Sequence, residues 1–550
     1  DRRESAATLG FREMENLCSE GYPALRTRPG RGLVETLKKP NGLLTKDALL
    51  WVDGKHLYMN GLEVGPELTD GEKSLVSMGA YVVVFPDKVY VNTQDVTDCG
   101  SLECERTAPA GSGLALCDET GTAYSGVTES AGAPEEPWEG ALWLDLSGTE
   151  PVLRQYSREV WTALEGVCVK VQAAGIGTGF AAGDGVEVSG CSVARLNGET
   201  VLQAADTDWV AFPGTVAGGA VTETAMKLRR FVPEMDYVVQ SGNRLWGCKY
   251  GMVDGKPVNE IYASKLGDCK NWRCFAGLAT DSYAAARGSD GVFTGAVSYL
   301  GNPIFFKERC MERVYASGSG AHQIVTTECS GVQKGSAKSL QVVGGVLYYL
   351  SDEGVQAFDG SLPVTVSQAL GERRYSAGVG GAWREKYYLS ALDEDGAASL
   401  LVYDSERKLW HREDELRAEG FACKGGELYC LSAEGKLLSM HGESGEKETG
   451  FTWLAETGEL GLQTPERKRL TRLLLAMRPE QGTTVAAWVS YDQGATWQKQ
   501  GQITGSGGIR EQLVAIRPRQ CRAMRLRLTG NGQCAIFAAT ALYERGSDRL

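Results

Sequence analysis

The stretch "GGVLYYLSDEG" (residues 344–354) has two relatives further along the chain, "REKYYLSALDEDG" (residues 384–396) and "GGELYCLSAEG" (residues 425–435). The first and third share the pattern G-G-x-L-Y-x-L-S-x-E-G, and the matching leucines lie 39 and then 42 residues apart. A period of about 40 residues is that of one four-stranded blade of a β-propeller. Glycine pairs and Asp/Glu-Gly turns stand where the hairpins of such a blade need them. The repeat therefore predicts a propeller.

Weaker copies of the same unit lie upstream. They are "VDGKHLYMNG" (residues 52–61), "FPDKVYVNT" (residues 85–93), "NRLWGCKYG" (residues 243–251) and "LGNPIFFKE" (residues 300–308). Together with the three clear repeats they predict about seven blades. The alternative is an array of β-sandwiches with accidental similarity, and the Trp-Asp dipeptide of the best-known propeller repeat is absent.

The repeat is interrupted twice, which predicts additional domains. The fold class that we expect is all-β, with a propeller, a small inserted β module and a β-sandwich at the end of the chain. Abundant glycine, 70 of 550 residues, is consistent with many short strands and tight turns. The expected divisions are N-terminal strands and first blades at 1–104, a flexible loop or linker at 105–140, the inserted module at 141–230, the remaining blades at 231–449 and the sandwich at 450–550.

Composition and charge exclude several functions. The formal net charge is −13 and the isoelectric point is near 5.1, which argues against a surface that grips nucleic acid, since phosphate binding needs clustered Lys and Arg. A passage through which DNA slides without sticking tolerates a negative wall. Apolar runs such as "AYVVVFP" (residues 80–86) are only as long as a strand, so we expect no membrane insertion. The chain opens "DRRES" rather than with Met, which leaves a trimmed start or a removed signal peptide open.

No motif predicts a metal or a cofactor. The fifteen cysteines include no C-x-x-C pair, and the closest spacings, Cys99 with Cys104 and Cys269 with Cys274, have no histidine nearby. We interpret most of the thiols as small buried hydrophobic groups in a reducing cytoplasm. "GIGTGF" (residues 175–180) lacks the third glycine of a dinucleotide loop. The four histidines are singly placed in the sequence: His56, His322, His411 and His441.

"SYDQGATW" (residues 490–497) fits the pattern S-x-D-x-G-x-T-W, the Asp box that sialidases and several other propeller proteins repeat. Asp492 can accept hydrogen bonds from the turn that follows it, Gly494 suits a positive φ, and Trp497 can pin the hairpin to a neighbouring sheet. None of these groups is an acid, a nucleophile or an anion clamp. The motif, formed by Ser490, Asp492, Gly494, Thr496 and Trp497, is therefore interpreted as a structural turn.

A sialidase-like or other glycan-hydrolysing or glycan-binding propeller is the alternative. Sialidases also carry several Asp boxes and an Arg-x-Pro tetrapeptide near the start, whereas this chain has one box and no Arg with Pro two residues on. Carboxylate pairs remain open, because 70 acidic residues let almost any fold bring two together. On balance we expect a protein that is not an enzyme.

Two further features have both a structural and an interface interpretation. Trp246, Trp272 and Phe275 are interpreted as packing between blades rather than as anchors for a neighbouring subunit. "PERKRLTR" (residues 465–472) is the one dense basic run, a solvated face or a contact with an acidic surface or DNA phosphate. The possible interface residues are Arg467, Lys468, Arg469 and Arg472.

With the ring, the insertion and the sandwich predicted, the chain resembles the β-propeller tail-hub or nozzle proteins of short-tailed phages and prophages. Six segments carry the resemblance and touch most of the chain outside 105–230. They are "GYPALRTRPGR" (21–31), "FVPEMDYVVQSGNRLWGCKYG" (231–251), "NEIYASKLGDCKNWRCF" (259–275), "GSDGVFTGAVSYLGNPIFFKE" (288–308), "VYDSERKLWHRED" (402–414) and "LYERGSD" (542–548).

The resemblance implies a structural virion protein, assembled in the host cytoplasm and located in the tail. It implies a ring of identical subunits, six in number, that lies below the portal or adaptor and surrounds a lumen crossed by genomic DNA at ejection. Partners would be other copies of the chain, the portal or adaptor and other tail proteins, with double-stranded DNA passing transiently. A bacterial propeller adaptor with another partner is a third interpretation.

Overall fold

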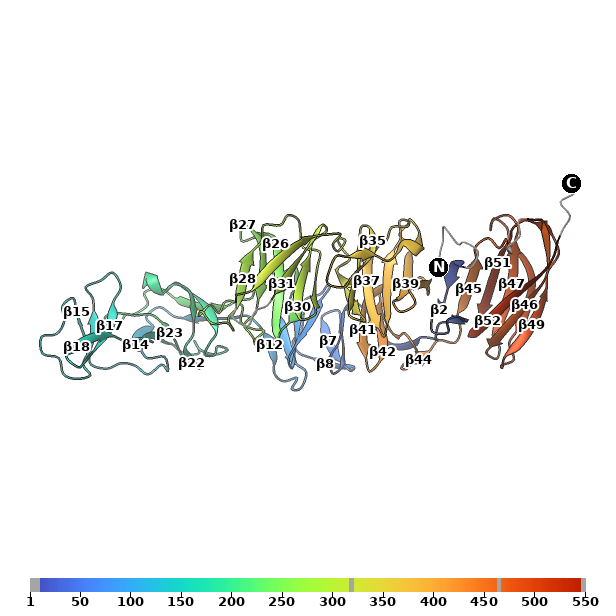
Figure 1. Cartoon of the computed structure of the whole chain (residues 1–550). Helices are drawn as coiled ribbons and strands as arrows, with labels where there is room; N and C mark the ends of the chain where they lie inside the picture. The colour runs from blue at the N-terminus through green and yellow to red at the C-terminus, as the bar shows by residue number, and fades with distance from the viewer. Residues whose placement is uncertain (1–9, 316–320, 462–465, 546–550) are drawn as a thin grey trace.

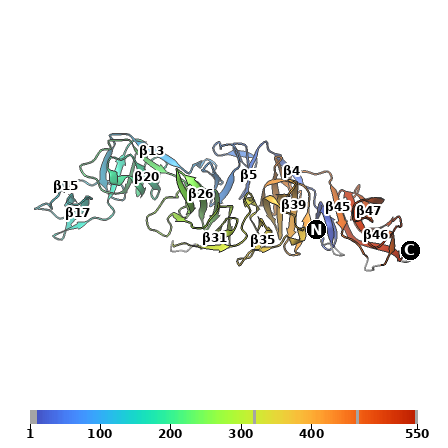
Figure 2. The same ribbon diagram turned by 90° about the horizontal axis from the view of Figure 1, so that it is seen from above.

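The computed structural model describes residues 10–315, 321–461 and 466–545, which form three all-β bodies in a row. A propeller occupies the middle, an inserted module projects from one end and a sandwich covers the other (Figure 1). The same order is seen from above, so the molecule is elongated in both views (Figure 2). The predicted fold class, a propeller with an insert and a sandwich, is confirmed.

Seven antiparallel blades can be traced within the described residues, six of them formed by consecutive strands. Blades one to four contain β5 (Pro40–Thr45), β6 (Leu49–Asp53), β7 (His56–Met59) and β8 (Leu62–Val64); β9 (Ser74–Met78), β10 (Tyr81–Phe85), β11 (Val89–Asn92) and β12 (Cys99–Ser101); β25 (Tyr237–Ser241), β26 (Arg244–Val253), β27 (Lys256–Ala263) and β28 (Tyr283–Ala286); and β29 (Gly295–Tyr299), β30 (Asn302–Phe306), β31 (Cys310–Tyr315) and β32 (Gln323–Glu328). Blades five to seven contain β33 (Gln341–Val343), β34 (Val346–Ser351), β35 (Gly354–Phe358) and β36 (Val364–Thr365); β37 (Ser376–Trp383), β38 (Lys386–Leu392), β39 (Ala398–Asp404) and β40 (Leu409–Arg412); and β41 (Ala418–Lys424), β42 (Glu427–Ser432), β43 (Lys436–Ser439), β4 (Gly32–Thr36) and β44 (Glu446–Lys447). Each of the seven sequence copies falls in a different blade. Short 3-10 helices follow β32 and β36, η2 (Ala337–Ser339) and η3 (Gln368–Leu370).

The repeat works because its central strand is covered on both sides. β34, formed by the first repeat, is buried at nearly every position, since the neighbouring blades pack against both of its faces. Gly344 and Gly345, with φ of +56° and +79°, form the two-residue turn that precedes it. Apolar clusters of this kind lie between each pair of successive blades among the described residues. The stability of the ring thus comes from contacts between blades.

The ring is closed by a strand from the beginning of the chain. β4 pairs antiparallel with β43, so the last blade is completed by residues about 400 positions upstream. The innermost strands β41 and β5 are in contact, and the closing cluster joins Leu431 and Leu437 to Leu37, Leu49 and Trp51. No covalent bond spans this closure among the described residues, because all fifteen cysteines are free.

The insert leaves the propeller after β12 and returns before β25. Its sheets contain β13 (Cys104–Ala108), β24 (Met226–Arg230), β20 (Gly185–Ser189) and β21 (Gly198–Val201); β14 (Gly113–Cys117), β19 (Cys168–Gln172), β23 (Trp209–Pro213) and β22 (Ala204–Asp206); and β15 (Val127–Ser130), β16 (Leu142–Asp145), β17 (Val152–Ser157) and β18 (Val160–Ala163), with the 3-10 helix η1 (Ala194–Leu196).

The prediction of a flexible linker at 105–140 is wrong. This segment contributes β13, β14 and β15 to the insert. β13 and β14 pair with β24 and β19, strands that lie far along the chain, and their few apolar side chains, including Ala108 and Leu114, are buried. Sparse apolar residues were enough to form strands because distant partners cover them, which the local composition does not reveal.

The sandwich is built from both ends of the chain. One sheet contains β1 (Phe11–Glu15), β45 (Thr452–Thr457), β51 (Arg525–Asn531), β47 (Thr484–Ser490) and β48 (Gln498–Thr504); the other contains β2 (Leu17–Cys18), β3 (Leu25–Thr27), β52 (Cys534–Arg545), β46 (Lys468–Pro479), β49 (Arg510–Ala515) and β50 (Gln520–Cys521). The expected sandwich at 450–550 therefore lacks three N-terminal strands that belong to it. Met14 and Leu17 lie in its core.

The aromatic residues of the third blade are placed as expected with one exception. Trp246 and Trp272 are buried between blades, in contact with apolar residues of the fourth and second blades respectively. Phe275 is 45% exposed and is not part of that packing. The prediction for Phe275 is wrong because this residue lines a surface cavity together with Glu199 and Val201 of the insert instead of lying between blades.

The closing cluster generates a stability prediction. Leu437→Ala removes a fully buried side chain beside β4, and we expect a loss of about 2–5 kcal/mol in the free energy of unfolding. Hydrogen exchange should show the amides of β4 losing protection first. Leu362→Ala is the control, since that side chain is 59% exposed and its loss costs less than about 0.5 kcal/mol. Equal effects of the two substitutions would contradict closure through β4.

Candidate functional site

The Asp box forms the turn between β47 and β48 in the sandwich. The Ser490 hydroxyl donates to Asp492 Oδ1 at 2.7 Å and accepts the Gly494 N–H at 2.9 Å. The Thr496 N–H donates to Asp492 Oδ1 at 2.9 Å, and the Thr496 hydroxyl donates to the other carboxylate oxygen. These hydrogen bonds, led by that of the Thr496 hydroxyl, lower the pKa of Asp492 to about 2. The carboxylate is thus used within its own turn.

The remaining residues of the box also have local contacts. Gly494 has φ of +95°, where a side chain is strained. The Trp497 ring packs on the guanidinium of Arg527 in β51, with 4.0 Å between the Arg527 Cζ and the ring centroid. The box therefore fastens the hairpin to a neighbouring strand of its own sheet.

Asp492→Ala tests this interpretation. Because the carboxylate accepts three hydrogen bonds, its loss should lower the denaturant midpoint of the sandwich and leave the propeller transition unchanged. The pKa of Asp492 in the folded protein lies below its unfolded value of about 3.9. Its contribution to the stability of the sandwich is therefore present above pH 4 and is lost as the pH falls toward 2. Unfolding followed by Trp fluorescence between pH 2 and 6 measures both effects. A variant with unchanged stability but altered ligand binding would contradict a purely structural role.

The basic run is divided between the inside and the outside of the sandwich. Lys468 is fully buried, and its Nζ donates to the Gly461 carbonyl at 2.5 Å. Arg467, Arg469 and Arg472 are exposed. Pro465 lies outside the described residues. The structure therefore leaves three arginines of the predicted interface at the surface and removes the lysine from it.

The candidate metal residues do not converge. Among the described residues, no three His, Cys, Asp or Glu side chains are grouped as metal ligands are. Ten of the fifteen thiols are buried, in agreement with their interpretation as hydrophobic groups. His411 is buried, and burial lowers its pKa to about 3. No helix in the described part of the chain is long and apolar enough to cross a membrane.

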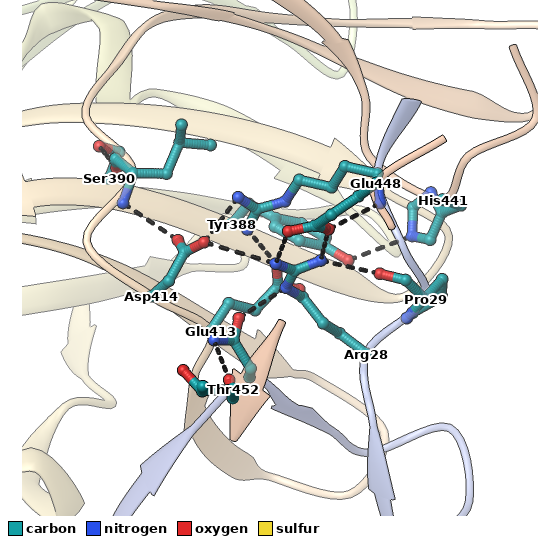
Figure 3. Close-up of polar contacts among 12 residues, drawn as sticks. Arg28, Pro29, Tyr388, Ser390, Glu413, Asp414, His441, Glu448 and Thr452 are labelled. Atoms are coloured by element: carbon teal, nitrogen blue, oxygen red, sulfur yellow. Dashed lines mark hydrogen bonds and ion pairs between the residues drawn. The ribbon is translucent and has the colours of Figure 1, made fainter. Parts of the chain in front are cut away.

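A cluster of buried and partly buried ion pairs lies at the joint between sandwich and propeller. The chain crosses this joint between β3 and β4, and crosses it again between β44 and β45. The two crossings run side by side, since the Glu448 N–H donates to the Arg31 carbonyl at 2.8 Å. Arg28, only 2% exposed, donates to both carboxylate oxygens of Glu448, at 2.9 and 3.2 Å, and stacks on Phe451. Asp414 also approaches Arg28, with 3.8 Å between its Oδ2 and Arg28 Nη2, and Figure 3 shows Asp414 and Glu448 on either side of the Arg28 guanidinium.

A third segment joins the cluster from the sixth blade. Arg31 donates to Asp414 Oδ2 at 2.7 Å and to Glu413 Oε2 at 2.8 Å. Although burial opposes its charge, the Asp414 and Glu413 carboxylates raise the pKa of Arg31 above its ordinary value. Burial raises the pKa of Asp414, but the charge of Arg31 outweighs it and leaves the pKa lowered. The Asp414 carboxylate is thus held ionised, as a hydrogen-bond acceptor rather than as a proton donor.

Sequence reasoning assigned no role to these residues. Arg28 and Arg31 lie in "GYPALRTRPGR", and Glu413 and Asp414 lie in "VYDSERKLWHRED", two segments that carry the family resemblance. The one sequence signal for the joint was the pair of arginines, Arg28 and Arg31, in a short segment between two strands. Their acidic partners are more than 380 residues away, so no local pattern connects them.

Arg31→Met should loosen the joint. It leaves two carboxylates without their main partner, and breaking a buried ion pair from one side costs about 3–5 kcal/mol. In the unchanged protein, ionised Asp414 contributes to the free energy of unfolding above pH 4, and this contribution is lost as the pH falls through the lowered pKa of Asp414. The stability of the variant should therefore depend less on acid pH. Calorimetry between pH 3 and 7 measures both.

Glu434→Gln is the matched control for the joint. Its side chain is exposed, and its ion pair within the described residues is with the exposed Lys436, so we expect little change in the melting temperature. If Arg31→Met behaved like this control, the joint would not depend on the cluster.

Comparison with known proteins gives a fold-level likeness only. No protein-family model and no curated protein matches the chain. Solved structures that match include an exo-β-1,3-galactanase from Phanerochaete chrysosporium, at 9% identity over 55% of this chain and 95% of that one, with a TM-score of 0.21. A phage phi92 endosialidase matches at 8% identity over 82% and 68% of the two chains, with a TM-score of 0.24. A family 43 arabinoxylan arabinofuranohydrolase from Bacillus subtilis matches at 9% identity over 56% and 95%, with a TM-score of 0.15.

These matches correct one expectation. The prediction that the chain is not an enzyme is contradicted, since glycoside hydrolases stand prominently among the solved structures that match, and it is withdrawn. At these identities and TM-scores the likeness concerns the all-β fold and assigns no substrate or activity to this chain.

Proposed function

We propose that the chain is a structural subunit of a phage tail, of the hub or nozzle type, and that six copies form a ring below the portal through which DNA leaves the capsid. The observation that carries the proposal is the elongated body of three domains in a row with a fixed joint between two of them (Figure 1). A subunit of a tall ring needs such a shape, because its contacts with the components above and below lie at opposite ends.

The joint supports this role through its stiffness. Two chain crossings, a bidentate Arg28–Glu448 pair and the Arg31 pairs hold the sandwich to the propeller in one orientation. A single flexible linker would leave the orientation of the domains free, whereas buried paired crossings fix it. Identical subunits with a fixed shape can close into a symmetric ring.

The charge of the chain is distributed unevenly between its domains. Residues 450–550 contain 14 Lys and Arg against 8 Asp and Glu, a formal net charge of +6, although the whole chain carries −13. The other residues therefore carry −19. An acidic propeller and insert would repel DNA phosphates and let the genome pass, while the basic sandwich suits an acidic partner in the tail.

The insert offers side chains for contacts between subunits. The sheet that contains β15, β17 and β18 is the part of the insert farthest from the propeller (Figure 1). Val160, the first residue of β18, is 57% exposed, and Trp138, between β15 and β16, is 70% exposed. Exposed tryptophan at the extremity of a domain is typical of a contact with another protein.

The test is the mass of the purified protein at low micromolar concentration, alone and with its cognate portal complex, followed by negative-stain images. We expect a closed ring, or a monomer that forms one on the portal. The variant Trp138→Ser with Val160→Ser should weaken the ring at least tenfold if the insert makes the contact, whereas Leu62→Ser, at an equally exposed position of the first blade, is its control.

One result would overturn the proposal. A strict monomer that ignores the portal, and that binds or cleaves a glycan, would favour the glycan-active propeller instead.

A further inference from the structure

A polar cavity of about 320 Å³ lies on the sandwich beside the Asp box. Its walls come from the turn after β47, which supplies Tyr491 and Gln493, and from the connection leading through β50 into β51. That connection supplies Arg519, Arg522 and Arg525. We propose that this cavity binds a phosphoryl group, as inorganic phosphate or as the monoester of a small molecule.

Three observations on the arginines support the proposal. Arg519 and Arg522 are exposed, and neither has an ion pair with any described residue. Arg525 is only 8% exposed, and its Nε meets no hydrogen-bond partner within the part of the chain described. A buried guanidinium N–H without a partner is costly, so it marks a place where an acceptor is missing.

The carboxylate nearest to Arg525 does not neutralise the cavity. Glu456 lies 3.6 Å from Arg525 Nη1, but its other oxygen accepts two hydrogen bonds from Arg527, at 2.7 and 3.1 Å. Glu459 is the one acidic residue in the lining. The formal charges of these groups add up to about +2, which matches a phosphate dianion at neutral pH. The groups counted are Arg519, Arg522, Arg525, Arg527, Glu456 and Glu459.

The cavity is held in shape by its surroundings. The Arg519 guanidinium lies over the Tyr491 ring, with 5.5 Å between the Arg519 Cζ and the ring centroid. The Tyr491 hydroxyl donates to the Arg517 carbonyl at 3.3 Å. The Asp box fixes the turn that carries Tyr491 and Gln493, so one wall is rigid. Planar guanidinium groups donate paired N–H groups that match the oxygens of a phosphoryl group.

The neighbouring strand extends the basic character beyond the cavity. β50 pairs with β46, so that Arg469 stands opposite Gln520. The exposed Arg469 thus lies next to a residue of the cavity lining, and it would raise the local concentration of an anionic ligand. The cavity differs from the exposed face of the basic run because its arginines surround a hollow of about 320 Å³.

Isothermal titration calorimetry of the full chain tests the proposal, with inorganic phosphate and glycerol phosphate as probes and chloride as the background anion. We expect both phosphates to bind and the double variant Arg519→Gln with Arg522→Gln to weaken binding at least tenfold. Neither side chain is buried, so the variant should keep its melting temperature. The matched control is Lys499→Gln with Arg510→Gln, which removes two exposed positive charges from the same sandwich outside the cavity.

Several results would overturn the proposal. The first is that the unchanged protein binds no phosphate. The second is that the control variant loses as much phosphate affinity as the cavity variant. The third is that the protein binds duplex DNA but neither inorganic phosphate nor glycerol phosphate. The last two would assign the basic residues to a general electrostatic surface, whose binding falls steeply with salt. Binding of phosphate that is lost only in the cavity variant would support a built site.

Discussion

The pairing of β4 with β43 is the contact on which the rest of the structure depends. A propeller is a ring of blades, and each blade is stabilised by two neighbours, so an open ring leaves two apolar faces uncovered. Here the chain closes the ring by bringing residues 32–36 beside residues 436–439. The cluster around Leu437 then buries the last uncovered pair of faces.

The same closure determines where the sandwich sits. The strand that completes the ring is reached directly from β3, and the strand beside it, β44, leads directly into β45. Both ends of the chain therefore leave the propeller at one point and must meet there. The Arg28 and Arg31 cluster lies at this point, where buried charged side chains are tolerated because each has an oppositely charged partner. The joint is a consequence of how the ring is closed.

The sequence predicted those parts of the fold that follow from local patterns. The repeat around Leu350, Leu389 and Leu431 was sufficient for the propeller and for the number of blades, because the central strand of each blade is formed and covered in the same way. The strands β13 and β14 were not predicted, and the expected N-terminal strands were not assigned to the sandwich. The reason is that β1, β3, β13 and β14 pair with segments between about 50 and 510 residues away.

The candidate sites followed the same rule. The Asp box can be interpreted from sequence alone because its hydrogen bonds lie within five residues. The basic run was predicted as one surface, although strand alternation turns Lys468 inward. The joint and the arginine cavity were not predicted, because each combines residues from three or more distant segments. Contacts of that kind become visible only when the fold is known.

The way in which the insert is attached has an evolutionary consequence. Its first and last strands, β13 and β24, pair with each other along their length, from Cys104 opposite Arg230 to Ala108 opposite Met226. The chain therefore leaves and re-enters the propeller at neighbouring points, and the two flanking blades are connected whatever lies beyond the paired strands. Recombination can exchange the whole module for another of different length without changing the register of the ring. A chain built in this way gains a new projecting domain in one genetic step, while the propeller and its closure remain as they are.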